Sequence, residues 1–323
     1  MPLINSYSQE ILRRRHGLSA HQINSLFGEK VYEESLEDKI RSLEKVAEFI
    51  RITDVLNSEG IGFIPLKGPV LSYRIYGEAT VREYCDLDLM VGLSSVSRTK
   101  DLLIGLGYEP VGYQLPERRS GQHIVFSHVH HVLFTHKAHD LRIELHWRLF
   151  QSPPVRFSKL NDLVTANLSE ITFEGRSFRV LSTELELLYL VMHGGIHSWR
   201  RLKWLNDIYE FLHRNKIDWE KFRAMAVELK AARLVSLANF LLSEFFPAGP
   251  SFPWDNERIP FMKSHAIIKI NGADEPENLK MKLSRLRFSF HCYPGWRYKI
   301  RRTGSAALFY LYQVFPKGRG TTA

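Results

Sequence analysis

Two aspartates, Asp86 and Asp88, stand at alternate positions of a mostly apolar segment, Cys85 to Val91, that alternates in the manner of a β-strand. Because alternate residues of a strand point to the same side, the two carboxylates should lie close together. Two neighbouring carboxylates repel, and the pKa of one of them rises unless a cation joins them. Mg²⁺ prefers one or two carboxylates together with phosphate oxygens. The pair therefore predicts a magnesium site. We expect Cys85, whose side chain should point the other way, to be a small core residue.

A third acid, Glu144, lies within a second predicted strand, Leu141 to Trp147, and shares a strand face with His146. The apolar neighbours of Glu144 indicate that the opposite face of this strand is buried. Glu144 is thus a candidate to join the two aspartates. The alternative is an ion pair with Arg142 or Arg148 on the same face of the strand.

These acids need a scaffold of strands and helices. Ser35-Leu-Glu-Asp38 has the spacing of a capping box and predicts a helix from there to about Asn57. Further elements are expected as a strand at Ile61 to Leu66, helices at Val70 to Tyr76 and Ser97 to Leu106, strands at Ile124 to Ser127 and Val132 to Thr135, and a hairpin joining Ile171–Phe173 to Phe178–Val180. After Leu181 a second capping-box match, Thr183-Glu-Leu-Glu186, opens a region of helical period that continues to Phe246.

Four blocks of sequence follow one another in order. They are Leu66-Lys-Gly-Pro-Val-Leu71 with Tyr76-Gly77 and Arg82, then Asp86-Leu-Asp-Leu-Met-Val91, then Glu144-Leu-His-Trp-Arg148, and finally HGGIHSWRRLKWLND from His193 to Asp207. Together they resemble the uncharacterised nucleotidyltransferase family of the polymerase-β superfamily, over about residues 35 to 215. The resemblance implies an α+β fold, in which a polymerase-β-like nucleotidyltransferase mixed sheet with flanking helices is followed by an all-helical domain.

The resemblance also implies roles. Asp86, Asp88 and Glu144 would be catalytic and would bind Mg²⁺, with Mn²⁺ as a possible substitute, and Glu144 would also orient or deprotonate the attacking hydroxyl. Gly68 would let the backbone approach the triphosphate at a helix N-terminus. Lys67 and Arg82 would supply positive charge to the phosphates, although Lys67 could instead only cap the turn.

One departure concerns the turn, where the wider superfamily has Gly-Ser or Gly-Gly and this chain has Gly68-Pro69, which removes one amide that could bind phosphate. In the helical block we expect His193, His197 and Lys203 to contact the nucleotide or the acceptor. The spacing of the two histidines would also suit zinc, but no His-Glu-x-x-His motif accompanies them. Asp207 would hold Arg200, Lys203 or a histidine in place.

A second group of histidines has no such family counterpart. We interpret it as a polar sheet surface rather than a metal site, because strand alternation should scatter its members over both faces. The group comprises His128, His130, His131, His136 and His139.

The net charge of +9 is concentrated at one end. Residues 278–323 contain ten Lys or Arg and no acid, whereas residues 1–277 contain 34 basic and 35 acidic side chains, a balance of −1. This end would attract polyphosphate, nucleic acid or anionic lipid, or would form amphipathic helices with solvated basic faces. Two cysteines make neither a disulfide framework nor a thiolate metal site, and no apolar run reaches the roughly 20 residues that span a bilayer. We expect a cytoplasmic protein without integral membrane association.

The sequence therefore predicts an N-terminal extension (1–34), a catalytic domain (35–180), a helical domain (181–250) and a basic C-terminal helical segment (251–323). The predicted reaction moves an NMP from a nucleoside triphosphate to an acceptor hydroxyl and releases pyrophosphate. The acceptor stays open between a small molecule, a peptide and RNA. Three alternatives remain: kinase-like transfer of the terminal phosphate, a toxin that modifies tRNA, and a non-catalytic nucleotide- or RNA-binding module. Base preference and oligomeric state are not indicated.

Overall fold

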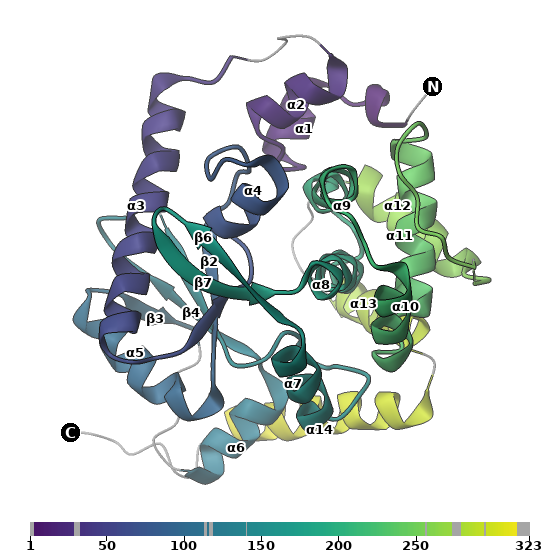
Figure 1. Cartoon of the computed structure of the whole chain (residues 1–323). Helices are drawn as coiled ribbons and strands as arrows, with labels where there is room; N and C mark the ends of the chain where they lie inside the picture. Colours follow the sequence, from purple (N-terminus) through teal and green to yellow (C-terminus); the bar gives the residue numbers. More distant parts are fainter. Residues whose placement is uncertain are drawn as a thin grey trace.

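The computed structural model describes residues 3–28, 33–112, 115, 119–139, 141–255, 257–272, 279–293 and 295–314 (Figure 1). The strands are β1 (Phe63–Pro65), β2 (Asp86–Val91), β3 (Glu109–Val111), β4 (His131–Thr135), β5 (Arg142–His146), β6 (Leu168–Phe173) and β7 (Arg176–Leu181). The helices are η1 (Leu3–Ser6), α1 (Gln9–Arg14), α2 (Ala20–Phe27), α3 (Leu36–Ser58), α4 (Pro69–Tyr76), η2 (Leu93–Ser95), α5 (Val96–Gly105), α6 (Arg119–His128), α7 (Phe157–Ala166), α8 (Thr183–Ile196), α9 (Leu202–Arg214), α10 (Trp219–Glu228), α11 (Ala232–Phe245), α12 (Pro260–Asn271), α13 (Leu279–Cys292) and α14 (Trp296–Val314).

The first five strands form one mixed sheet in the order β1-β2-β5-β4-β3. β2 and β5 run parallel at its centre, whereas the other neighbouring pairs are antiparallel. A parallel pair needs a long connection, and here the chain between β2 and β5 forms α5, β3, α6 and β4. The fold is therefore α+β, with a mixed sheet and flanking helices followed by a run of helices, as the sequence predicted.

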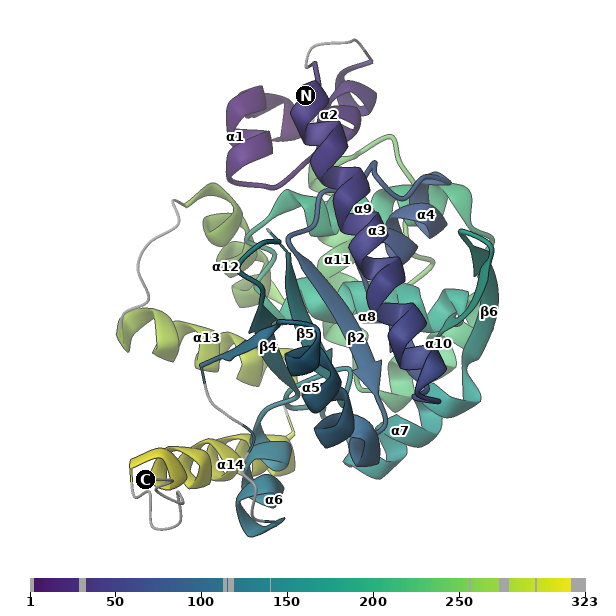
Figure 2. The ribbon, with the colours of Figure 1, turned by 90° about the vertical axis from the view of Figure 1, so that its left-hand side faces the viewer.

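Each face of the central strands packs against different helices. Leu87 and Leu89 of β2 are buried with Phe49 of α3 and Leu103 of α5, and Figure 2 shows these two helices in front of the sheet. Met90, on the other face of β2, packs into the core that includes α8 and α9, which lie behind the sheet in the same view. The face that carries the aspartates is thus turned toward the helical part of the chain.

Several local predictions are confirmed. Ser35 caps α3 by accepting a hydrogen bond from the Asp38 amide. The β6–β7 hairpin turns at Glu174 and Gly175, both with positive φ (48° and 71°), as tight hairpin turns require. The second capping match is wrong by one residue, because Ser182, not Thr183, accepts the hydrogen bond that caps α8.

Two further predictions about the fold are wrong. The expected strand at Ile124–Ser127 lies in helix α6, because a four-residue apolar run does not distinguish strand from helix and tertiary packing decides. Phe126 of α6 contacts Trp147, and His128 stacks on Phe309 of α14, at centroid distances of 4.9 and 4.5 Å. Cys85, expected in the core, is exposed because it lies just before β2, where strand alternation no longer fixes the side chain, although its carbonyl accepts a hydrogen bond from the Arg142 amide at 3.1 Å.

The C-terminal helices complete the molecule. They begin with α12, α13 ends at Cys292 and α14 begins at Trp296. α14 lies alongside α6 in both ribbon views (Figures 1 and 2). The proposed domain boundaries remain predictions.

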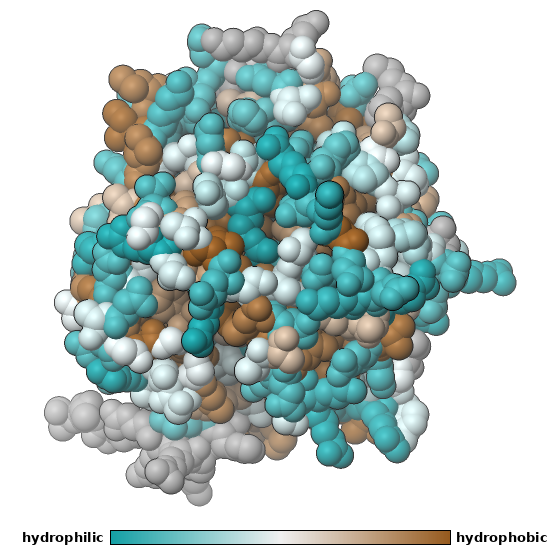
Figure 3. Space-filling view, viewed as in Figure 1, coloured by the Kyte–Doolittle hydropathy of each residue, from teal (hydrophilic) through white to brown (hydrophobic). Residues whose placement is uncertain are grey.

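The surface is mostly hydrophilic on the face shown in Figure 3. An apolar group at the upper left lies where Figure 1 places the start of α3, whose Leu36, Ile40 and Leu43 are exposed. Among the described residues, no helix combines the length and apolar character needed to cross a bilayer.

Candidate active site

The three predicted acids lie on the two central parallel strands. In the β2–β5 register, Asp88 stands opposite Glu144 and Asp86 stands opposite Arg142. Directly paired residues share a sheet face, so Asp88 and Glu144 are neighbours, and Asp86 lies one pleat away on the same face. Carboxylate oxygens of Asp88 and Glu144 lie within 4.8 Å of each other and of a nitrogen of His146.

Two cationic side chains neutralise these acids. Lys67 Nζ lies 2.9 Å from Asp88 Oδ1, and His146 Nε2 lies 3.0 Å from the same oxygen and 3.2 Å from Glu144 Oε2. Arg142 and Arg148, the partners considered for Glu144, do not hold it. Arg142 is exposed, and Arg148 donates to the Val129 carbonyl and lies over the Phe157 ring.

The pKa values follow from this arrangement. Burial by itself would lower the pKa of His146, but hydrogen bonds to Asp88 and Glu144 raise it to about 9. Burial would raise the pKa of Glu144, but the hydrogen bond from His146 and the charges of His131 and Lys67 lower it to about 2. Burial likewise opposes the charge of Lys67, yet Asp88, Asp86 and Glu144 raise its pKa above the ordinary value. At neutral pH the site therefore holds an ionised Glu144 together with the cations His146 and Lys67.

The Lys67-Gly68 turn brings the backbone to the aspartates. The Leu66 amide donates to the Asp88 carbonyl (2.9 Å), which extends the β1–β2 pairing up to this turn. Gly68 has φ 75° and ψ −144°, a conformation essentially restricted to glycine, and an added Cβ would lie 3.1 Å from a Leu87 methyl group. Pro69 then begins α4, as expected for proline in a first helical turn.

Residues 15–247 match the family described as uncharacterised nucleotidyltransferase. The chain belongs to this family. No curated protein gives a significant match.

One similar solved structure is the lincomycin-bound lincosamide antibiotic adenylyltransferase LnuA, with 17% identity and a TM-score of 0.37. The similarity covers 52% of this chain and 97% of that one. So weak a likeness carries no information on the substrate of this nucleotidyltransferase.

Arg82 was expected to bind phosphate, but in this nucleotidyltransferase its side chain is held by another residue. Arg82 Nε donates to Asp207 Oδ2 at 2.8 Å, and both side chains are buried. Asp207 was expected to hold Arg200, Lys203 or a histidine, and its partner is Arg82 instead. Lys203 lies near this pair, since burial and the charge of Arg82 lower its pKa to about 8. Arg82 thus joins the segment before β2 to α9 rather than offering a free charge.

Helix α8 presents three side chains to the acids at a spacing of four residues. They are Tyr189, His193 and His197. Burial and the charge of Lys67 lower the pKa of His193 well below its ordinary value and that of His197 to about 4, so both rings are neutral. The two rings lie 4.6 Å apart and both contact Trp204 of α9.

The structure therefore places His193 and His197 near the acids, and their expected contact with the nucleotide or the acceptor stays a prediction. The groups of possible metal ligands among the described residues do not include these two histidines. Tyr189 was not among the site residues predicted from the sequence. Burial and the charge of Asp88 raise the pKa of Tyr189, and the charge of Lys67 opposes this rise. The signal was present in the sequence, because Tyr189 precedes the two histidines by one helical turn on the same face.

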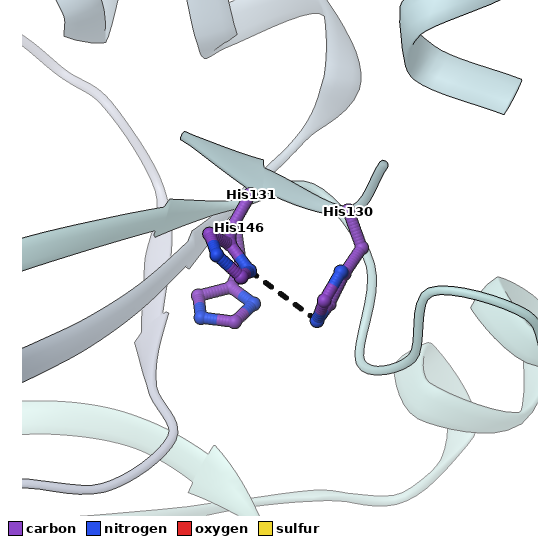
Figure 4. A group of neighbouring side chains, drawn as sticks. All are labelled: His130, His131 and His146. Atoms are coloured by element: carbon purple, nitrogen blue, oxygen red, sulfur yellow. Dashed lines mark hydrogen bonds between the residues drawn. The ribbon is translucent and has the colours of Figure 1, made fainter. Parts of the chain in front are cut away.

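The second histidine group is scattered as predicted except for two of its five members, which lie together. His128 lies on α6, and His136 and His139 pair with each other at 4.5 Å. His130 and His131, however, lie together beside His146 (Figure 4). The alternation argument failed because His130 lies at a bend just before β4, so its side chain does not follow the alternation of that strand.

Proposed function

We propose that this nucleotidyltransferase transfers an NMP from a nucleoside triphosphate to an acceptor hydroxyl with Mg²⁺, or Mn²⁺ in its place, and releases pyrophosphate. The observation that carries the proposal is the β2–β5 register, which pairs Asp88 with Glu144 and leaves Asp86 on the same face. Three acids at the centre of a sheet, next to a glycine turn and a helix N-terminus, suit a metal-bound triphosphate.

The carboxylates of Asp86, Asp88 and Glu144 would hold the ion. Their oxygens are the hard ligands that Mg²⁺ prefers, and the contacts with Lys67 and His146 show that this position already attracts positive charge. The ion would neutralise charge on the phosphates and align the reacting oxygens.

Other residues of the chain have separable roles. Lys67, released from Asp88 when the metal binds, would pair with a phosphate oxygen. Glu144, with a pKa of about 2, is a weak base but a good acceptor, so it would orient the attacking hydroxyl by a hydrogen bond. We assign the nucleotide's non-phosphate part to the neutral rings of His193 and His197 with Trp204, which offer stacking and hydrogen bonds without competing charge.

The acceptor would be anionic. The described residues of α13 and α14 carry eight Lys or Arg and no acid. Arg285 of α13 is the member of this group whose charge contributes to the lowered pKa of His197. A phosphate-bearing acceptor such as an RNA end fits this charge better than a neutral small molecule.

The test is incubation of the full-length protein with each labelled NTP, Mg²⁺ and either total RNA or an RNA-free small-molecule extract. We expect pyrophosphate as the product, with the label from the α-phosphate on the RNA fraction. Accumulation of a nucleoside diphosphate would show kinase-like transfer instead, and label confined to the small-molecule fraction would overturn the anionic-polymer acceptor.

Asp88→Ala should abolish turnover, while Asp101→Ala, which removes an exposed acid of α5, should leave it unchanged. Turnover by Asp88→Ala equal to wild type would remove the acids from the mechanism. No turnover by the wild-type protein with any NTP would favour the non-catalytic binding module.

A further inference from the structure

Three imidazoles meet at the edge of the sheet where β4 begins and β5 ends. In the β4–β5 register His131 stands opposite His146, and His130 extends the pairing because its carbonyl accepts from the Trp147 amide at 3.0 Å. The ring centroids lie 4.4 Å (His130–His131), 4.9 Å (His131–His146) and 5.2 Å (His130–His146) apart. Figure 4 shows the three rings converging from two strands and the bend before β4.

The nitrogen spacing fits a tetrahedral metal site. One nitrogen from each ring lies within 4.8 Å of the others, and His130 Nε2 is 3.3 Å from His131 Nδ1. Around a tetrahedral ion with metal–nitrogen bonds of about 2.0–2.1 Å, neighbouring ligand nitrogens are separated by about 3.3–3.4 Å. Two of the three ligands are therefore already at the distance that a shared ion would impose.

The third ring, that of His146, has one nitrogen that could bind a metal ion. His146 uses Nε2 for its contacts with Asp88 and Glu144, and its buried Nδ1 has no hydrogen-bond partner among the described residues. A metal-binding histidine commonly donates its other N–H to a carboxylate, which fixes the orientation of the ring. The arrangement at His146 has this form, with two carboxylates in place of one, and a metal ion would displace the proton that Nδ1 of the cationic ring carries.

We propose that His130, His131 and His146 bind a divalent transition-metal ion of the zinc type, with a fourth position left for water or a substrate atom. Nitrogen ligands select such ions over Mg²⁺, which prefers oxygen. The site differs in this respect from the carboxylate site, although the two adjoin at His146. It does not depend on the proposed transfer reaction.

Charged side chains of both signs surround the proposed site. Asp88 and Glu144 favour a cation there, and Glu144 Oε2 lies 3.9 Å from His131 Nδ1. Lys67 and Arg148 oppose it, because their charges reach His131 and His130 respectively.

The experiment titrates Co²⁺, as a visible probe for zinc, into metal-stripped full-length protein in excess Mg²⁺ and without nucleotide. We expect one Co²⁺ per chain with the strong visible absorption of low-coordinate imidazole ligation. His130→Gln and His131→Gln should each weaken the affinity by about 10- to 100-fold or more. His136→Gln is the matched control, since this ring also pairs with a neighbouring histidine but lies outside the group, and it should bind like wild type.

Two results would overturn the proposal: no stoichiometric Co²⁺ in the wild-type protein, or unchanged Co²⁺ affinity in both His130→Gln and His131→Gln. Circular dichroism checks that each variant is folded, and crystallographic location of the Co²⁺ ion in wild-type protein decides the matter should a variant fail to fold. Asp86→Asn separates this proposal from the proposed function, because it should lose NTP turnover and keep the Co²⁺ spectrum. A wild-type protein that binds Co²⁺ but turns over no NTP would contradict the transfer reaction alone.

Discussion

The buried ion pair between Arg82 and Asp207 should be a principal link between the catalytic sheet and the helical part of the chain. Arg82 precedes β2, its backbone amide donates to Ser72 of α4 at 3.0 Å, and its side chain bonds to Asp207 of α9. The exposed fractions are 4% for Arg82 and 0% for Asp207, so water cannot replace a lost partner. Asp207→Ala would leave a guanidinium buried without its carboxylate.

The loss of stability can be worked out from the distance between the two charged groups. At 2.8 Å and an effective dielectric constant of about 20, the Coulomb attraction is about 6 kcal/mol. Burial opposes both charges, and the carboxylate raises the pKa of Arg82 in spite of it. Removing one partner of such a pair costs about 3–5 kcal/mol, and we expect the free energy of unfolding to fall by that amount.

Urea unfolding followed by tryptophan fluorescence measures this change. The double variant Arg82→Met/Asp207→Leu should recover most of the loss, because it removes both charges together. Glu59→Ala is the exposed control: it breaks a 2.6 Å contact with Arg98 that solvent screens, so the loss should stay below about 1 kcal/mol. A loss under about 1 kcal/mol in Asp207→Ala, or a double variant as unstable as the single one, would refute the reasoning.

Three further predictions follow from the site. Gly68→Ala should lower the free energy of unfolding by about 1–3 kcal/mol, because it places a side chain at φ 75° against Leu87. Gly62→Ala is the control and should lower this free energy much less, because an added Cβ would meet open space there. Chemical denaturation of the two variants compares them. Burial lowers the pKa of Lys203 in the folded state to about 8, so the unfolded chain binds the proton of this side chain more tightly. Lys203→Met should therefore be more stable than wild type, and the difference in the free energy of unfolding should be largest below pH 8 and disappear as the pH rises toward 10.5. Equal differences at pH 7 and pH 10 would contradict this. Chelation by EDTA should stop pyrophosphate release and excess Mg²⁺ should restore it, whereas turnover that persists in EDTA would exclude a divalent ion from the reaction.

Much of the arrangement of the acids could be predicted from the sequence. The alternation around Asp86 and Asp88 identified β2 and its buried face, and the family resemblance supplied Glu144 as the third acid. Local rules also located the Gly68 turn and the two histidines of α8, since backbone conformation and helical spacing depend on few residues.

The remainder depends on contacts between distant segments. Nothing near Arg82 in the sequence indicates Asp207, because only the packing of α4 and α9 brings them together. His130 joins His146 through a bend that alternation does not describe, and α6 is helical because of what it packs against. These misses share one cause: short apolar or polar runs carry too little information to outweigh tertiary packing.

Location of the ion tests the central claim most directly. Crystals of the protein grown with Mn²⁺ and a non-hydrolysable NTP analogue should give an anomalous peak bounded by the carboxylates of Asp86, Asp88 and Glu144, with the triphosphate against the Lys67-Gly68 turn. A bound nucleotide with no metal peak at these three carboxylates, or with its phosphates on another face of the sheet, would contradict the account.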